Sequence, residues 1–407
     1  MKKFIILIII LVLIILLLLF FNTNEKSFTI EDLDNQEEEE MIEEGVVDSE
    51  ISNELKERDL EPEIRVVNIP VIDVDTPGEV RSIYYTAYSA GNNNRINQAI
   101  DLYRNGEINS VIIDINGYKG FISYNSNIPE VKKYDLEDIR TPNLRETIKK
   151  LNEEGIYVIA RITVFQDLAY AQVRPELAIK APSTGEIWKD NGGQGWLDPS
   201  SKEAWNYKLA IAKEATKMGF DELNFDYIRF PSDGDFKDIE YPFWDEEKSR
   251  REVMKEFFAF LRKSLPNETL SVDLFGLTTI SRDDLGIGQV IEDAYPYFNF
   301  IAPMVYPSHY ANGFMNYQNP SEQPYGVVYF SMWNALKRLE VHRQNNPESR
   351  DTKLRPWLQD FNLGATYNEF MVKIQIDATK AALGDEYVGF MMWNPSNNYT
   401  RGALNPN

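Results

Sequence analysis

Hydrophobic residues recur along residues 80–398 with two periods, one typical of strands and one typical of helices. Short apolar runs bounded by turn residues predict eight strands, at 83–88, 110–115, 157–165, 223–230, 270–275, 300–306, 354–361 and 387–393. Longer stretches with a helical spacing of apolar residues predict seven helices between most of them, at 94–102, 143–154, 202–218, 248–264, 289–297, 325–340 and 367–383.

This alternation predicts an α/β fold, a (β/α)8 TIM barrel over residues 79–400, in which the last helix is short, absent or supplied by the N-terminal flank. A doubly wound open sheet is the alternative. Such a sheet normally carries a glycine-rich phosphate-binding loop after its first strand, and residues 87–92 read A-Y-S-A-G-N instead. The barrel is therefore the preferred prediction.

An uncharged apolar segment, residues 4–21, follows Lys2 and Lys3 at the start of the chain. As a helix it would be roughly 27 Å long, at about 1.5 Å per residue, which is enough to cross the core of a bilayer. A cleaved signal peptide is the alternative, but residues 20–23 (F-F-N-T) do not offer a small-residue cleavage site. We expect residues 1–24 to form an uncleaved, single-pass membrane anchor, with the lysines in the cytoplasm and the remaining chain outside the cell.

Residues 25–78 are predicted to form an acidic, flexible linker. Within them, residues 31–65 hold 16 Asp and Glu against three Lys and Arg, a local charge of −13 out of −22 for the whole chain. Low hydrophobicity and self-repelling charge favour an extended, solvated tether, with binding of a basic partner as the alternative. The same acidity argues against nucleic acid as a ligand, because phosphate binding relies on clustered Lys and Arg.

One predicted strand contains a carboxylate within an apolar run. Residues 219–231 read G-F-D-E-L-N-F-D-Y-I-R-F-P, and Asp226 lies in the middle of the run. A carboxylate in such a place is costly unless it is paired or used in chemistry. Strand periodicity places Asn224 and Asp226 on one face, near the end of the strand where barrel enzymes carry catalytic residues.

Polar residues recur near the ends of five other predicted strands. They are Asp114, Arg161, Asp273, Tyr306 and the pair Gln359–Asp360. Any one of them could be a satisfied polar group in the core. Five strands with the same pattern favour a solvated site at the C-terminal end of the barrel, with Arg161 and Arg229 available to pair with carboxylates or to hold a substrate oxygen.

Aromatic residues follow several of the same strands: Trp188, Trp196, Tyr306, His309, Tyr310, Trp357 and Trp393. Each taken alone is more often a core residue than a ligand platform. Together with carboxylates and amides they favour carbohydrate, because aromatic faces stack on sugar rings while polar groups bind the hydroxyls.

Other kinds of catalytic site have few residues from which to be built. The chain has no cysteine, so thiol nucleophiles, thiolate metal sites and disulfides are excluded, and it has two histidines, His309 and His342. No G-x-S-x-G, H-E-x-x-H or Walker motif is present. We expect carboxylate chemistry without a cofactor, although an all-oxygen Mg²⁺ or Ca²⁺ site remains an alternative.

Several long motifs resemble a bacterial family of glycoside hydrolases of the TIM-barrel type. They read G-F-D-E-L-N-F-D-Y-I-R-F-P-S, Y-V-I-A-R-I-T-V-F-Q-D, V-D-L-F-G, I-A-P-M-V-Y-P-S-H-Y, L-R-P-W-L-Q-D-F and G-F-M-M-W-N, and they extend over residues 81–400. The resemblance maps onto Asp226, Arg229, Asp273, Tyr306, His309, Gln359 and Asp360. One departure lies at the second strand, where the family's D-V-K-like ending reads Asp114-Ile115-Asn116, so we rank Asp114 below the others.

We therefore expect an extracellular, membrane-anchored glycoside hydrolase that acts on a cell-wall or exopolysaccharide glycan, peptidoglycan included. Asp226 is the expected ionised carboxylate and Asp273 the expected acid, with Asp360 as its substitute. Retention of the anomeric configuration is favoured over inversion. The expected substrate-binding residues are Arg161, Arg229, Tyr306, His309, Trp357, Gln359 and Trp393. A non-catalytic carbohydrate-binding module and a metal-dependent hydrolase are the alternatives.

Overall fold

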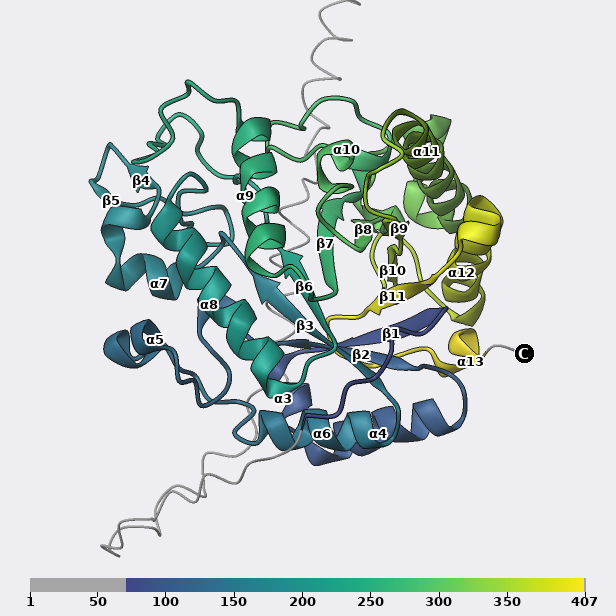
Figure 1. Ribbon diagram of the computed structural model, residues 1–407. Helices are drawn as coiled ribbons and strands as arrows, with labels where there is room; N and C mark the ends of the chain where they lie inside the picture. The colour runs from purple at the N-terminus through teal and green to yellow at the C-terminus, as the bar shows by residue number, and fades with distance from the viewer. Residues whose placement is uncertain (1–70, 406–407) are drawn as a thin grey trace, which may run out of the picture. The chain divides into compact units, whose positions relative to one another are not determined.

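Nine parallel strands form one closed sheet in the computed structural model, which describes residues 71–405 (Figure 1). The strands are β1 Val80–Tyr85, β2 Ser110–Asp114, β3 Tyr157–Thr163, β6 Glu222–Asp226, β7 Leu270–Phe275, β8 Phe300–Met304, β9 Lys353–Leu354, β10 Trp357–Gln359 and β11 Gly389–Trp393. Their order is β10-β11-β1-β2-β3-β6-β7-β8-β9, and β10 also pairs with β8. This last pairing closes the barrel, so the open-sheet alternative is wrong.

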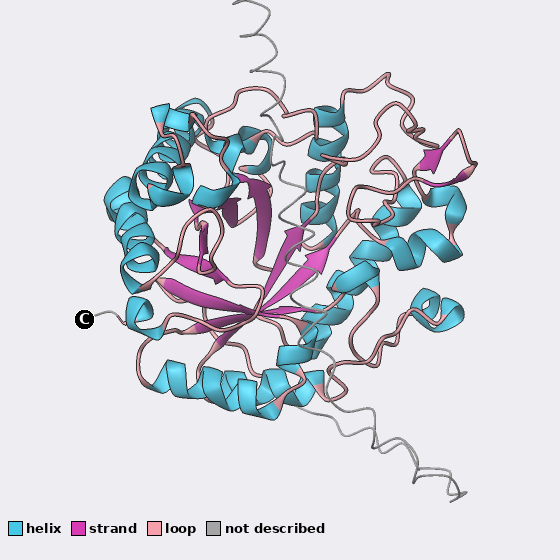
Figure 2. Cartoon of the chain, turned by 180° about the vertical axis from the view of Figure 1, so that it is seen from behind, coloured by secondary structure: helices cyan, strands magenta, loops and turns pink. Residues whose placement is uncertain are grey.

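Helices surround the barrel, as Figures 1 and 2 show from opposite sides. They are α3 Ala87–Ala90, α4 Asn93–Arg104, α5 Pro129–Tyr134, α6 Leu144–Glu153, α7 Leu168–Val173, α8 Lys202–Met218, α9 Arg250–Ser264, α10 Ile291–Ala294, α11 Pro324–Asn345, α12 Glu369–Leu383 and α13 Arg401–Leu404. A small antiparallel hairpin, β4 Lys180–Ala181 and β5 Glu186–Ile187, lies outside the barrel. The short α13 agrees with the expectation of a reduced last helix.

The ends of these helices follow from local sequence. Helix α8 ends at Gly219, which has a φ of 100°, a backbone conformation that glycine adopts without a Cβ penalty. Helix α9 begins with a capping box, in which the side chains of Ser249 and Glu252 each bond the other's backbone N–H. The predicted helix at 289–297 is one turn only, Ile291–Ala294.

Two predicted strands are wrong in their extent. The strand predicted at 223–230 ends at Asp226, because Tyr227 has a φ of 48° and cannot continue an extended chain. The strand predicted at 354–361 is divided into β9 and β10 around Pro356, whose missing N–H interrupts a strand ladder. Together, β9 and β10 take the place of the seventh strand of an eight-stranded barrel.

The inward-facing side chains of the strands form their own cluster, separate from the larger apolar core between strands and helices. It consists of Tyr84, Ile112, Tyr157, Ile159, Ala302, Tyr306, Trp357 and Met391. At the end of the barrel where the strands begin, the fully buried Glu222 and Arg355 form an ion pair, and Tyr157 Oη donates to Glu222 over 3.0 Å. The interior is therefore closed at one end, and the polar residues near the strand C-termini lie at the other.

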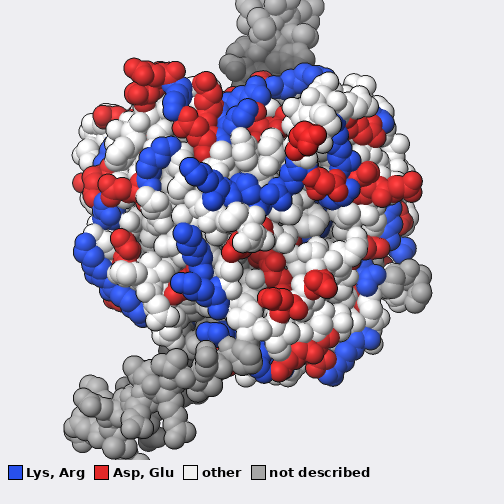
Figure 3. Space-filling model, in the orientation of Figure 1, with Lys and Arg blue, Asp and Glu red and all other residues white. Residues whose placement is uncertain are grey.

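The expected membrane anchor and most of the expected linker lie outside the described residues. Among the helices of residues 71–405, none is long and apolar enough to span a membrane. The face of the barrel domain in Figure 3 carries both Lys or Arg and Asp or Glu side chains, with the two signs interspersed. By contrast, the sequence charge of residues 31–65 has one dominant sign.

Candidate active site

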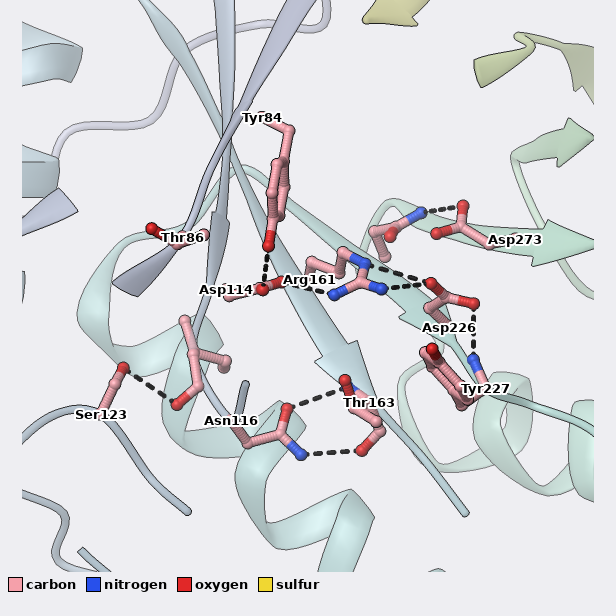
Figure 4. Close-up of polar contacts among 12 residues, drawn as sticks. Tyr84, Thr86, Asp114, Asn116, Ser123, Arg161, Thr163, Asp226, Tyr227 and Asp273 are labelled. Atoms are coloured by element: carbon pink, nitrogen blue, oxygen red, sulfur yellow. Dashed lines mark hydrogen bonds and ion pairs between the residues drawn. The ribbon is translucent and has the colours of Figure 1, made fainter. Parts of the chain in front are cut away.

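Four side chains from four neighbouring strands form one continuous polar chain inside the barrel (Figure 4). Tyr84 Oη on β1 donates to Asp114 Oδ2 on β2 over 2.5 Å. Arg161 on β3 then contacts Asp114 Oδ1 at 2.7 Å and Asp226 Oδ2 on β6 at 2.5 Å. Burial lowers the pKa of Arg161, but the surrounding acidic groups, Asp114 and Asp226 foremost, together raise it by more, so the guanidinium remains charged between two carboxylates.

Asp226 is held at both of its oxygen atoms. Oδ2 accepts from Nε and Nη2 of Arg161, and Oδ1 accepts from the backbone N–H of Tyr227 over 2.6 Å. The φ of 48° at Tyr227 is an uncommon conformation for a residue with a side chain and costs of the order of 1–3 kcal/mol. The strained residue therefore directly follows the carboxylate and supplies one of its hydrogen bonds.

Asp273 lies on β7 in a different environment. Its Oδ1 accepts from Asn224 Nδ2 and from Trp357 Nε1, each over 2.8 Å, and its Oδ2 is buried with no hydrogen bond from a described residue. The side chain is 1% exposed. Burial first, and then the charge of Asp226, raise the pKa of Asp273 well above its usual range, against the opposing effects of the two hydrogen bonds and of the charge of Arg161.

Strand register places the two aspartates beside each other. Phe225 on β6 pairs with Val272 on β7, so the next residues, Asp226 and Asp273, occupy matching positions. Both side chains face the interior of the barrel, and neighbouring strands are about 4.8 Å apart. Asn224, which we placed on the same strand face as Asp226, contacts Asp273 as described above, and this prediction is confirmed.

Arg229 lies apart from the polar chain, among aromatic rings. Its guanidinium carbon is 4.9 Å from the ring centre of Trp196, 5.1 Å from that of Tyr227 and 4.7 Å from that of Phe275. Its Nη1 donates to Phe230 O and to Ser232 Oγ. The two arginines that we expected to have similar roles are therefore in different environments, and Arg161 is the one that pairs with Asp226.

An aromatic cluster lies at the C-terminal ends of β8, β10 and β11. The ring centre of Tyr306 is 5.0 Å from that of His309 and 5.2 Å from that of Trp393, and Phe361 packs against all three rings. Enclosure among these groups lowers the pKa of His309 to about 4, so its imidazole is neutral at pH 7. The structure thus brings together three of the residues expected to bind substrate.

Gln359 and Asp360 use their side chains to hold neighbouring segments of the chain. Gln359 Oε1 accepts from the backbone N–H and Oγ of Ser308, and its Nε2 donates to Phe361 O. Both Asp360 oxygens accept from Thr400, one from the backbone N–H and one from Oγ1, each over 2.7 Å. Burial raises the pKa of Asp360 to about 6. Their geometry favours a positioning role over direct contact with a substrate.

Sequence reasoning ranked Asp114 too low for its place in the polar chain and did not select Tyr84. Strand alternation could have found Tyr84, since its side chain faces inward like Ser82 before it on β1. Trp357, which was expected to bind substrate, directs its indole N–H to Asp273. In residues 71–405 no group of three or more His, Asp or Glu is placed to hold a metal ion.

Comparisons with known proteins bear on the fold and the family of the chain. No curated protein matches the chain. A solved structure of a hypothetical protein from Ruminiclostridium thermocellum is 35% identical over 50% of this chain and 98% of its own, with a TM-score of 0.44. The glycoside hydrolase domain of PgaB (BpsB) from Bordetella bronchiseptica is 15% identical over 80% of this chain and 98% of its own, with a TM-score of 0.54, and has a similar fold.

A family model described as "Putative glycosyl hydrolase domain" matches residues 82–399, which covers nearly all of the barrel. This range contains every residue of the polar chain, Asp273 and the aromatic cluster. The chain belongs to this family of glycosyl hydrolase domains.

Proposed function

We propose that this barrel hydrolyses glycosidic bonds with Asp226 and Asp273 as its carboxylate pair. Glycoside hydrolysis needs one protonated carboxyl group to assist the leaving oxygen and one ionised carboxylate to attack the sugar or to activate water. The observation that carries the proposal is the contrast between two adjacent aspartates, one in an ion pair and one buried with no described cation within ion-pair distance. Such a contrast separates an acid from a base.

Asp273 is the proposed general acid. Its raised pKa favours the protonated form, and a carboxyl proton on Oδ2 would have no acceptor among the described residues. A glycosidic oxygen that approaches Oδ2 would receive this proton as the bond to the sugar breaks. Asn224 and Trp357 hold the other oxygen and so fix the direction of the carboxyl group.

Asp226 is the proposed ionised partner. Arg161 and the Tyr227 N–H hold its charge and orientation, and the residue is more exposed than Asp273, at 7% against 1%. Retaining enzymes place their carboxyl groups roughly 5 to 5.5 Å apart and inverting enzymes place them farther apart. Matching positions on adjacent strands favour the shorter spacing, so we propose retention.

The proposed substrate is a glycan outside the cell, from the cell wall or an exopolysaccharide. The cluster of Tyr306, His309, Phe361 and Trp393 offers aromatic surface at the same, C-terminal end of the barrel strands as the carboxylates. The extracellular location and the membrane attachment rest on the apolar segment at residues 4–21.

The test is incubation of the full-length protein with a panel of polysaccharides and peptidoglycan, with released fragments measured by mass spectrometry. We expect fragments from at least one polymer, and loss of release in Asp226→Asn and Asp273→Asn. Asp360→Asn is the matched control and should keep most of the activity. Binding without release would favour a carbohydrate-binding module, and loss of release with EDTA would favour a metal-dependent hydrolase.

A further inference from the structure

Arg229 is a buried cation without a carboxylate partner. It is 5% exposed, and no described Asp or Glu lies within ion-pair distance of its guanidinium. Arg355, the other buried arginine of the described residues, pairs with the equally buried Glu222. A buried charge is normally compensated by a partner, since its loss of hydration is costly. Arg229 is therefore unusual within this molecule.

The unused donors of Arg229 lie on one edge of the guanidinium. Nη1 donates to Phe230 O and Ser232 Oγ, whereas Nε and Nη2 donate to no described residue. These two nitrogens present parallel N–H groups, the arrangement that binds a carboxylate at both oxygens. In Arg161 the same edge, Nε and Nη2, binds Asp226. This edge therefore binds a carboxylate of the protein in Arg161 and is open in Arg229.

The position of Arg229 relates it to the proposed site. It follows Asp226 by three residues, and its ring contacts are Tyr227, directly after Asp226, and Phe275, two residues after Asp273. Tyr227 and Phe275 are both partly exposed, while Trp196 beneath them is fully buried. A ligand at the open edge would therefore lie near the C-terminal ends of β6 and β7, the two strands that carry the aspartates.

We propose that Arg229 binds the carboxylate of an acidic sugar, so that the substrate is an anionic glycan. This inference rests on the proposed function, and it adds the substrate class. A carboxylate would satisfy the two free N–H donors and compensate the buried charge, and the partly exposed rings of Tyr227 and Phe275 offer surface to the sugar ring. A phosphorylated sugar offers similar oxygens and is a separate arm of the test.

The experiment measures binding, so that it is independent of turnover. Full-length protein with Asp226→Asn, which keeps a bound glycan intact, is titrated by calorimetry with oligogalacturonate, oligoglucuronate and muramic-acid-containing glycan strands. Each acidic probe is compared with its carboxyl-reduced, neutral counterpart, and a phosphorylated oligosaccharide is added as a further probe. We expect at least one acidic probe to bind about tenfold or more tightly than its neutral counterpart, the effect of a charge-assisted bidentate contact.

Arg229→Met, which keeps much of the packing volume, should abolish this preference and leave the affinity for the neutral probe unchanged. Arg104→Gln, at an exposed ion pair with Glu154, is the matched control and should keep the preference. Thermal unfolding of each variant establishes that it is folded. Four outcomes would each overturn the proposal. They are equal affinity for acidic and neutral probes, a preference that survives in Arg229→Met, tighter binding of the phosphorylated probe, and no binding of any acidic probe. A wild-type protein that releases no fragments from the panel of polysaccharides and peptidoglycan would contradict the proposed function and leave this binding test unaffected.

Discussion

Asp226 and Asp273 occupy matching positions on adjacent strands, yet Arg161 pairs with Asp226 while an amide and an indole hold Asp273. The same barrel layer therefore contains one aspartate in an ion pair with an arginine and a second aspartate whose pKa is raised well above its usual range by burial and by the charge of Asp226. Both residues are buried, and they differ in their nearest cation: Arg161 pairs with Asp226, whereas no described cation lies within ion-pair distance of Asp273.

Asp273→Asn should lower hydrolysis of a natural glycan by about 10²- to 10⁴-fold, the usual contribution of a positioned general acid. A substrate with a nitrophenolate leaving group needs no proton from the enzyme, so its hydrolysis should fall much less. Steady-state rates on the two kinds of substrate make the comparison. An equal loss on both would contradict the assignment of Asp273 as the acid.

Trp357→Phe should move the alkaline limb of the pH–rate profile to higher pH. Activity needs protonated Asp273 and is lost as pH rises through its pKa. The Trp357 indole N–H stabilises the ionised form and lowers the pKa of Asp273, so its removal raises that pKa further. Trp205→Phe, whose indole donates to Pro199 O instead, is the control and should leave the profile in place. If the alkaline limb of the pH–rate profile stayed in place in Trp357→Phe, Asp273 would not be the general acid.

Arg161→Met should destabilise the protein by about 3–5 kcal/mol, because it leaves two buried carboxylates, Asp114 and Asp226, without their shared cation. Urea unfolding at pH 7 measures the change. The exposed Arg140, paired with Asp138, is the control, and Arg140→Met should change the free energy of unfolding by no more than about 0.5 kcal/mol. Similar values for the two variants would contradict a shared charge network.

Asp360→Asn should reduce the loss of stability between about pH 4 and pH 7. Burial raises the pKa of Asp360 to about 6, above the value of about 3.9 in an unfolded chain. The folded state therefore holds the proton more tightly, and stability falls as pH rises from about 4 through 6. A pKa shift of this size corresponds to about 2–3 kcal/mol in the free energy of unfolding. The wild-type protein should lose this amount as the pH rises, and the Asn variant should not. Unfolding by urea at both pH values tests this, and parallel curves for the two proteins would refute it.

The sequence predicted the parts of the fold that depend on periodicity. Alternation along the strand predicted at 223–230 placed Asn224 and Asp226 on one face, and the helix at 202–218 was predicted at its observed bounds. It could not predict where a single backbone angle ends a strand. The left-handed conformation of Tyr227 ends β6, and the backbone N–H of this residue donates a hydrogen bond to Asp226. Tyrosine has no preference for this conformation, so its presence in the sequence does not signal such an angle.

Contacts between distant segments also escaped prediction. Asp360 bonds Thr400, 40 residues later, and Trp357 bonds Asp273, 84 residues earlier. The sequence made Arg161 and Arg229 both available to pair with carboxylates, and the barrel brings Arg161 to Asp226 from β3. Which cation meets which carboxylate is set by strand order and register, and these become known only when the barrel is closed.

The most direct test of the carboxylate pair is the rate of Asp226→Asn on a glycan that the wild-type protein cleaves. The account predicts a folded protein with the unfolding midpoint near that of the wild type and with hydrolysis lost on both natural and nitrophenyl substrates, because the ionised partner acts whatever the leaving group. A folded Asp226→Asn protein that hydrolyses the same glycan at a near-normal rate would contradict the central claim.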